Sequence, residues 1–315
     1  MPGRKGDAAI SGGNYIKSLK NIPASVRQRL LNRARSDQRP FNELLQYYAM
    51  ERFLYRLSQS SHTDRFILKG ALMLRVWRSP EVRPTMDIDM LGRTSTEEAD
   101  LVAQIRDILA VDVEADGLIF DPDSIQTERI TEDTDYEGTR IRFRGTLDTA
   151  RINMQIDIGF GDIVYPGPEE SDLPTILNFP APRLLCYSRE SSIAEKLEIM
   201  VKRGVLNSRM KDLYDIWLLS RQFDFVGDRL AEAIRLTFEH RGTTVPAEIE
   251  ASTEPFIEAK QTQWATFRKR LRQEHVPDSF REVAIAIDGF LAPIVAAISS
   301  SEAYPKNWTA AGSWI

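Results

Sequence analysis

Apolar residues recur at two different spacings along the chain, and the change comes near its middle. In the first half, short apolar segments with strand-like alternation are interspersed with helical ones. Segment 151–160, RINMQIDIGF, alternates strictly, which predicts a strand with one buried face. The other predicted strands are 65–69, 86–91, 125–131 and 138–147. The predicted helices of this half are 24–36, 41–60, 71–77 and 95–109. Residues 162–183 are proline-rich and predict a loop.

From about residue 189 onward the apolar spacing is almost entirely helical. It predicts a helical hairpin, followed by three further helices. The hairpin consists of 191–205 and 209–223, and the helices cover about 227–240, 246–275 and 279–299. The sequence therefore predicts an α+β fold with a short mixed sheet, followed by a helical C-terminal part. We expect a flexible tail at 1–20, an α/β domain at 21–185 and a helical domain at 186–315.

Both ends of the chain read as weakly structured. The N-terminal 18 residues are polar and glycine-rich and lack the apolar core of a signal peptide. Residues 304–315 predict a loosely ordered end. The longest apolar segment, 284–298, contains Pro293 and predicts a buried helix with a break, so we expect no membrane span.

The charge balance narrows the classes of function. The chain has 41 basic and 46 acidic residues, a formal net charge of −5. This argues against a protein that coats nucleic acid along its surface, but it leaves room for a local basic patch. A single cysteine, Cys186, allows no internal disulfide and favours a reducing, cytoplasmic setting. The three scattered histidines have no metal-ligand spacing.

Two aspartates stand one residue apart in an apolar segment, RPTMDIDMLG at 83–92. Side chains at i and i+2 of a strand share a face, so the carboxylates of Asp87 and Asp89 repel unless a cation lies between them. The natural partner is a hard divalent ion, most often magnesium. The alternative is a solvated strand edge without a role.

Gly70 and Asp157 strengthen the metal interpretation. Gly70 ends a strand where a helix begins, so a phosphate could approach the backbone there. An ordinary strand-to-helix turn is the simpler alternative. Asp157 lies on the polar face of segment 151–160 and would meet Asp87 and Asp89 if the two strands were neighbours. It could equally be a surface aspartate.

The helical hairpin offers a lysine and several acids. Lys196 lies beside the apolar stripe of its helix and could reach into a cleft, where a lysine offsets triphosphate charge. Arg209, Asp212 and Asp215 follow at three-residue spacing. The alternative is a surface salt-bridge group that includes Glu195, worth under about 1 kcal/mol.

Together, these segments resemble a known family. The blocks FILKGALMLRVW, RPTMDIDMLG, MQIDIGFGD, AEKLEIMVKRG and RMKDLYDIWLL look like the AbiEii/AbiGii nucleotidyltransferase toxins of type IV, AbiE-like toxin–antitoxin systems. The resemblance covers about residues 40–240. It implies a polymerase-β-like nucleotidyltransferase fold, a role linked to phage defence, and magnesium-dependent transfer of NMP from an NTP. Some members modify the 3′ end of tRNA, and an antitoxin encoded by a neighbouring gene relieves the arrest.

The resemblance also implies roles for individual residues. Asp87, Asp89, Lys196 and Asp212 would be catalytic, and Asp157 would join Asp87 and Asp89 as a metal ligand. The residues that would bind the nucleotide are Lys69, Gly70, Ala71, Thr85 and Arg209.

One position departs from the family pattern, and two other assignments leave alternatives open. Ala71 stands where the family more often has Ser or Gly, which removes a hydroxyl but keeps the backbone amide. Asp215 is an alternative to Asp212 as the active-site acid. The basic segment 267–275 could touch RNA phosphates, or it could be the solvated face of a helix.

Three other functions compete with tRNA modification. The same fold could modify a protein or a small molecule, and a non-catalytic module could bind a nucleotide or a partner. A pure scaffold, however, has no reason to hold like charges together. A D-x-D glycosyltransferase would need a larger parallel sheet than these short strands suggest.

Overall fold

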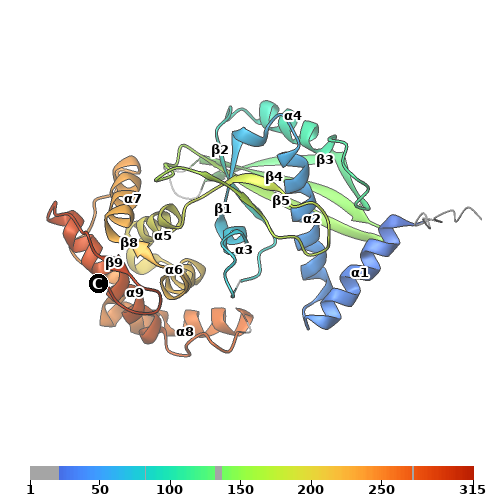
Figure 1. Ribbon diagram of the computed structural model, residues 1–315. Coiled ribbons are helices and arrows are strands. Elements are labelled where there is room, and N and C mark those ends of the chain that lie inside the picture. Colours follow the sequence, from blue (N-terminus) through green and yellow to red (C-terminus); the bar gives the residue numbers. More distant parts are fainter. Residues whose placement is uncertain (1–20, 82, 132–136, 272) are drawn as a thin grey trace, which may run out of the picture.

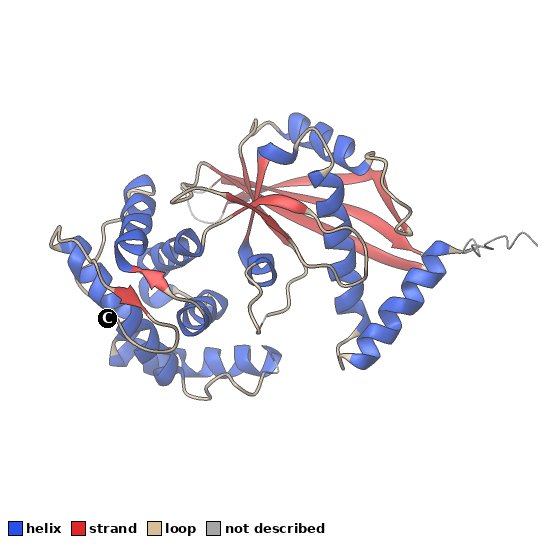
Figure 2. Cartoon of the chain, viewed as in Figure 1, coloured by secondary structure: helices blue, strands red, loops and turns tan. Residues whose placement is uncertain are grey.

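The computed structural model describes residues 21–81, 83–131, 137–271 and 273–315, and the predicted tail at 1–20 lies outside them. In these residues the predicted architecture is confirmed: a mixed sheet with helices is followed by a helical part (Figures 1 and 2). The sheet has seven strands in the order β3-β4-β5-β2-β1-β7-β6. They are β1 (Phe66–Lys69), β2 (Ile88–Gly92), β3 (Leu118–Thr131), β4 (Glu137–Leu147), β5 (Ala150–Phe160), β6 (Glu169–Asp172) and β7 (Arg183–Cys186).

Most neighbouring strands are antiparallel, but β2 pairs with β5 and β1 pairs with β7 in parallel. The helices of this half are α1 (Ile22–Ser36), α2 (Phe41–Ser58), α3 (Met73–Val76) and α4 (Glu98–Leu109). The predicted helix 71–77 is thus a 3-10 turn, Gly70–Leu72, followed by the short α3.

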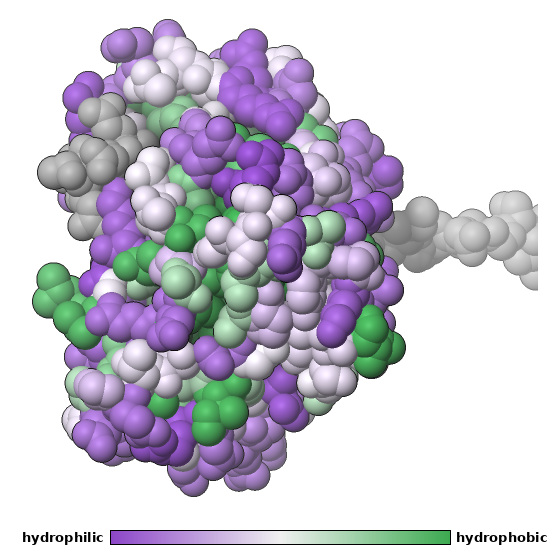
Figure 3. Space-filling view, turned by 90° about the vertical axis from the view of Figure 1, so that its left-hand side faces the viewer, coloured by the Kyte–Doolittle hydropathy of each residue, from purple (hydrophilic) through white to green (hydrophobic). Residues whose placement is uncertain are grey.

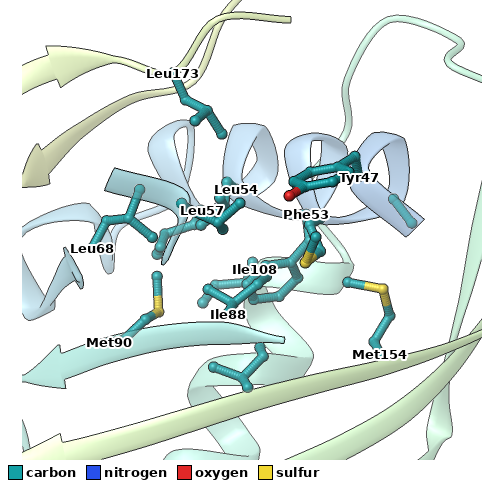
Figure 4. Packing of buried hydrophobic residues seen from close by; sticks show 14 of the residues in the cluster. Tyr47, Phe53, Leu54, Leu57, Leu68, Ile88, Met90, Ile108, Met154 and Leu173 are labelled. Atoms are coloured by element: carbon teal, nitrogen blue, oxygen red, sulfur yellow. The ribbon is translucent and has the colours of Figure 1, made fainter. Parts of the chain in front are cut away.

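Helix α2 carries the core of the sheet half. It follows Pro40, whose fixed φ suits a helix start, and 13 of its 18 residues are buried. Its Leu54 and Leu57 face Leu68 and Ile88 from the sheet (Figure 4). Burying each such leucine stabilises the fold by about 1.5–3 kcal/mol. The strands that hold the predicted site are therefore fixed from one face, and the other face stays open.

The predicted loop 162–183 is partly wrong. It contains β6, and β7 begins at its last residue. Both strands have only four residues, too short to show a period. They form because β7 pairs with β1, which lies far away in sequence, with Leu68 opposite Cys186. Cys186 itself is buried, as expected for a small apolar residue.

The helical part follows β7. It contains α5 (Arg189–Arg203), α6 (Met210–Gln222), α7 (Gly227–His240), α8 (Glu254–Leu271) and α9 (Phe280–Ser299). These helices share a second hydrophobic cluster, separate from the one under the sheet. Helix α9 continues through Pro293, so the predicted break is wrong. Among the described helices, α9 alone has the length and hydropathy of a membrane span, yet it packs against α6, α7 and α8.

The predicted loose end is also wrong. Strand β9 (Asn307–Trp308) pairs with β8 (Phe225–Val226), and Trp308 is buried in the helical cluster. The surface of the helical part is mostly hydrophilic, and hydrophobic side chains show there as separate small patches (Figure 3).

Candidate active site

Three neighbouring strands bring the predicted acids into one row. β2 lies between β1 and β5, so Asp89 is directly opposite Lys69 on one side and Asp157 on the other. Asp87 comes one residue before β2 begins. Carboxylate oxygens of Asp87, Asp89 and Asp157 all lie within 4.8 Å of one another. The alternation of segment 151–160 thus predicted the right face for Asp157.

Gly70 is required by the space around Asp89. Its φ of +70° lies in the left-handed region, and a Cβ there would stand 1.9 Å from Oδ2 of Asp89. Any other residue would strain the backbone and displace the carboxylate. The structure therefore gives Gly70 a steric reason in addition to the predicted approach of a phosphate.

Asp89 carries unbalanced negative charge. Burial raises its pKa to about 6, with a further contribution from Asp87, against the opposing effect of Lys211 and Arg83. Thr85 donates a short hydrogen bond from its hydroxyl to the Asp87 carboxylate. Thr85 is not among the residues that line the cleft, and its predicted contact with a nucleotide stays a prediction.

Asp157 already has a cationic partner. The guanidinium of Arg140, on the neighbouring β4, donates to both oxygens of Asp157 at 2.8 and 2.7 Å. Such a bidentate pair is strong for a partly exposed site. Asp87 and Asp89 are consequently better placed than Asp157 to hold a metal.

The helical hairpin presents Lys196 to the same cleft. Its Nζ lies 3.2 Å from Asp215 and 3.6 Å from Asp212. Burial would lower the pKa of Lys196, but these two aspartates raise it above its ordinary value. Arg209 donates to Asp212 at 2.6 Å, and Asp212 and Arg209 line the cleft, whereas Asp215 does not.

Asp215 is held by Arg83, which itself lines the cleft. The Arg83 guanidinium donates to both Asp215 oxygens at 2.8 and 3.0 Å. Burial alone would raise the pKa of Asp215, but Arg83 and Lys196 hold it below its usual range. The surface salt-bridge interpretation of the hairpin does not fit these buried pairs.

A second charged network was missed by the sequence prediction. Lys69 donates to Asp162 and to Glu195, both at 3.0 Å, and Tyr187 donates to Glu195 at 2.6 Å. Arg241, after α7, reaches Asp162 at 2.7 Å. Burial raises the pKa of Glu195, against the opposing effect of Lys69 and Arg241. Glu195 directly precedes Lys196, and Asp162 follows Asp157 by five residues. Nothing in the local sequence indicates that Arg241 belongs to the site.

This network joins the two halves of the molecule. Lys69 comes from the end of β1 and Glu195 from α5, and each is the sequence neighbour of a predicted site residue, Gly70 or Lys196. If Lys69 contacts a nucleotide as predicted, its ammonium group has to interact with the nucleotide as well as with Asp162 and Glu195.

These residues line a cleft of about 370 Å³ between the sheet and helices α5 to α7. Nine lysine and arginine side chains face seven carboxylates there, although the chain as a whole is acidic. His240, to which the sequence gave no role, also lines the cleft. Ala71 is buried outside it, and the basic residues 268–270 lie at the end of α8, also outside it.

The donor set fits a hard divalent cation. Asp87, Asp89 and Asp157 supply only carboxylate oxygens, the ligands that such ions prefer. A cation would also relieve the repulsion that contributes to the raised pKa of Asp89. The engagement of Asp157 by Arg140 limits its share.

Comparisons with known proteins agree with this chemistry. Residues 52–286 match the family model described as nucleotidyl transferase AbiEii toxin, type IV TA system. No curated protein sequence matches the chain. A candidate nucleotidyltransferase from H. pylori is 15% identical with a TM-score of 0.46, covering 83% of this chain and 98% of its own. JHP933 from Helicobacter pylori is 12% identical with a TM-score of 0.42, covering 87% and 93%.

Proposed function

Because the chain belongs to the AbiEii family of nucleotidyl transferase toxins, we propose that it moves NMP from an NTP to the 3′ end of tRNA in a magnesium-dependent reaction. Family membership makes the chain a nucleotidyltransferase toxin of a type IV toxin–antitoxin system, with an NTP substrate and a cognate antitoxin. The identity of the metal, the acceptor and the roles of individual residues are what we propose beyond family membership. A tRNA acceptor places the reaction in the cytoplasm.

The observation that carries the proposal is the arrangement of acidic and basic side chains on the two walls of one cleft. Three carboxylates converge on one wall, and Lys196 and Arg209 lie with Asp212 on the other. An NTP brings about four negative charges at neutral pH, so it needs cations on both sides. The excess of lysine and arginine in the cleft supports a polyphosphate as its occupant.

We assign Asp87 and Asp89 as the principal metal ligands, with Asp157 contributing. When bound there, magnesium would neutralise phosphate charge and lower the pKa of the attacking hydroxyl. Gly70 lets the Asp89 carboxylate take its position, and the Thr85 hydroxyl fixes that of Asp87.

The remaining residues would bind and orient the triphosphate. Lys196 offers its ammonium from α5, positioned by Asp212 and Asp215. Arg209 at the start of α6 reaches the same wall. Such preorganised charges contribute most where charge develops in the transition state. The helical part from 186 to 315 would thereby complete a site whose metal ligands belong to residues 21–185.

The direct test is transfer of label. The purified protein is incubated with magnesium, total tRNA and each α-labelled NTP in turn. We expect label in tRNA with at least one NTP, and loss of at least 100-fold in rate with Asp87→Asn. Chelation of the metal should abolish transfer in the same way.

Periodate-oxidised tRNA provides the matched control, because oxidation destroys the terminal 2′,3′-diol and leaves the rest of the molecule intact. Label on oxidised tRNA, or on protein alone, would rule out the 3′ end as the acceptor.

A further inference from the structure

A second groove adjoins the cleft, and Asp87 lines both. It encloses about 720 Å³ and is lined mainly by β3, β4 and β5, with Gln46 of α2 also contributing. On β4, Ile141 and Phe143 are buried whereas Arg142 and Arg144 are exposed. The groove includes residues 153–155 of β5 and the cleft includes residues 157–160, so the two follow one another along this strand and share Asp87.

The groove is polar and close to neutral. It has two arginines, Arg142 and Arg144, and two carboxylates, Asp87 and Asp123. In register with the arginines on β5 are Gln155 and Asn153, and Gln126 on β3 stands opposite Arg142. A carboxamide offers a hydrogen-bond donor and an acceptor together, and such a pair can form two hydrogen bonds with the edge of a nucleobase.

Two of these amides are available to a ligand. The side chains of Gln126 and Asn153 are exposed and make no hydrogen bond with the residues that the structure describes. Met86, next to Asp87, is 55% exposed and gives the groove an apolar surface beside the acid. A base could lie against such a surface while its edge meets an amide.

The ion pairs of the two arginines lie at the surface, and Arg142 also donates a hydrogen bond to Gln155 at 3.3 Å. Arg142 lies 2.6 Å from Glu128, with both side chains about half exposed, and Arg144 lies 3.1 Å from the exposed Asp121. Exposed pairs of this kind are worth about 1 kcal/mol or less. A phosphate, which arginine binds in bidentate fashion, can replace these carboxylates at little cost.

We propose that this groove binds the terminal nucleotides of a single-stranded RNA acceptor, with Arg142 and Arg144 on its phosphates and Asn153 and Gln126 on its bases. The assignment rests on the proposed transfer to RNA and adds the place where the acceptor lies. The groove is continuous with the cleft through Asp87 and combines amides with arginines. Both features favour RNA over a polypeptide as its occupant.

The position of the groove fits the chemistry of the transfer. The terminal hydroxyl oxygen of the RNA attacks the α-phosphorus of the NTP and forms a new phosphodiester. The bond between the α-phosphorus and the bridging oxygen breaks, and pyrophosphate leaves with that oxygen. The hydroxyl proton passes to solvent. In-line attack needs the acceptor and the leaving group on opposite sides of the α-phosphorus, and a groove that meets the cleft at Asp87 gives the acceptor its own approach to that phosphorus.

The test uses the full chain with both arginines changed, Arg142→Gln/Arg144→Gln. We expect the KM for tRNA to rise roughly tenfold or more, while the KM for NTP stays unchanged. The dependence of tRNA affinity on salt should fall, because each lost phosphate contact removes about 0.7 from the log–log slope for single strands. A merely structural effect would not change that slope.

Arg129→Gln is the matched control. Arg129 lies on β3, is 74% exposed at its side chain and pairs with Glu98 of α4, which marks the opposite face of the sheet. The control should keep the wild-type KM for tRNA and the wild-type salt slope.

Binding of fluorescent tRNA in EDTA without NTP separates the two proposals. Loss of binding in the double variant supports the groove even if wild-type protein transfers no label. Wild-type transfer to tRNA with unchanged affinity and salt slope in the double variant overturns the groove alone. Transfer to a protein, unaffected by the arginine changes, overturns both.

Discussion

At the residue scale, two acids of the site have different partners, although their spacing in the sequence gives no reason to distinguish them. Asp212 and Asp215 are three residues apart on α6, and Lys196 contacts both. What distinguishes them is their arginine partners, because Arg83 from the segment before β2 pairs with Asp215 whereas Arg209 pairs with Asp212. No spacing within the hairpin predicts a partner from so far away in sequence. The sequence predicted that the acids and the lysine lie together, and it favoured Asp212 as the active-site acid, but it could not predict the contact between Arg83 and Asp215.

When each acid is replaced by asparagine, we expect one variant to lose mainly stability and the other to lose mainly activity. Asp215→Asn leaves Arg83 and Lys196 facing a neutral group, and we expect it to lower the free energy of unfolding by about 3 kcal/mol. Asp212→Asn should lower it less, because Arg209 can reach solvent and Lys196 keeps Asp215. The transfer rate should fall most in Asp212→Asn.

Urea unfolding and transfer rates at low temperature measure both effects. If Asp215→Asn were as stable as the wild type and as inactive as Asp212→Asn, the two roles would have to be exchanged.

At the scale of elements, long periodic segments could be predicted and short or long-range ones could not. Helices α2, α5, α6 and α7 and strands β4 and β5 match their predicted ranges within a few residues. Helix α8 begins at Glu254 and not near 246. Pro255 is a signal for this start, because proline is favoured in the first turn of a helix. β6 and β7 depend on tertiary pairing that no local pattern shows.

Helix α2 contains an acid that should make the stability of the fold depend on pH. Glu51 is 3% exposed and accepts a hydrogen bond from the backbone of Ile176 at 2.7 Å. Burial raises its pKa from 4.5 to about 7. Because the folded state binds this proton more tightly than the unfolded state, the contribution is complete below pH 4.5 and is lost as the pH rises through about 7.

Glu51→Gln should remove that dependence, since glutamine keeps an acceptor for Ile176 without a charge. We expect the wild type to lose up to about 3 kcal/mol of stability from this group between pH 4.5 and 7.5, and the variant to lose less. Urea unfolding across this range measures the difference. Parallel curves for the two proteins would show that Glu51 does not titrate there.

At the scale of the whole molecule, the end of the chain closes the helical part that presents Lys196 and Asp212. The Trp308 indole donates to the carbonyl of Ser220 at 2.6 Å, at the end of α6. Its ring lies 4.8 Å from that of Phe290 in α9. The sequence prediction failed here because residues 304–315 have polar spacing with isolated tryptophans, whose partners lie in other helices.

Trp308→Ala should therefore destabilise the protein by about 3–5 kcal/mol through the cavity it leaves. Activity should be lost on heating at a lower temperature than in the wild type. Ile315→Ala is the control, because Ile315 is 75% exposed and its loss should cost under about 0.5 kcal/mol. Thermal unfolding of both variants decides whether the end of the chain is structural. Equal unfolding temperatures would mean that it is not.

The strand order also imposes a delay on each newly made chain. β1, which ends at Lys69 and Gly70, pairs in parallel with β7, and Lys69 needs partners as late as α5. At about 5–20 residues per second, ribosomes take roughly 10–30 s to pass from β1 to the end of α7. During that time the acids of β2 have been synthesised, but the lysine that faces them has not yet folded opposite. If the proposed site needs both parts, we expect the chain to be inactive until its helical part has been translated, and a cognate antitoxin could bind it during that interval.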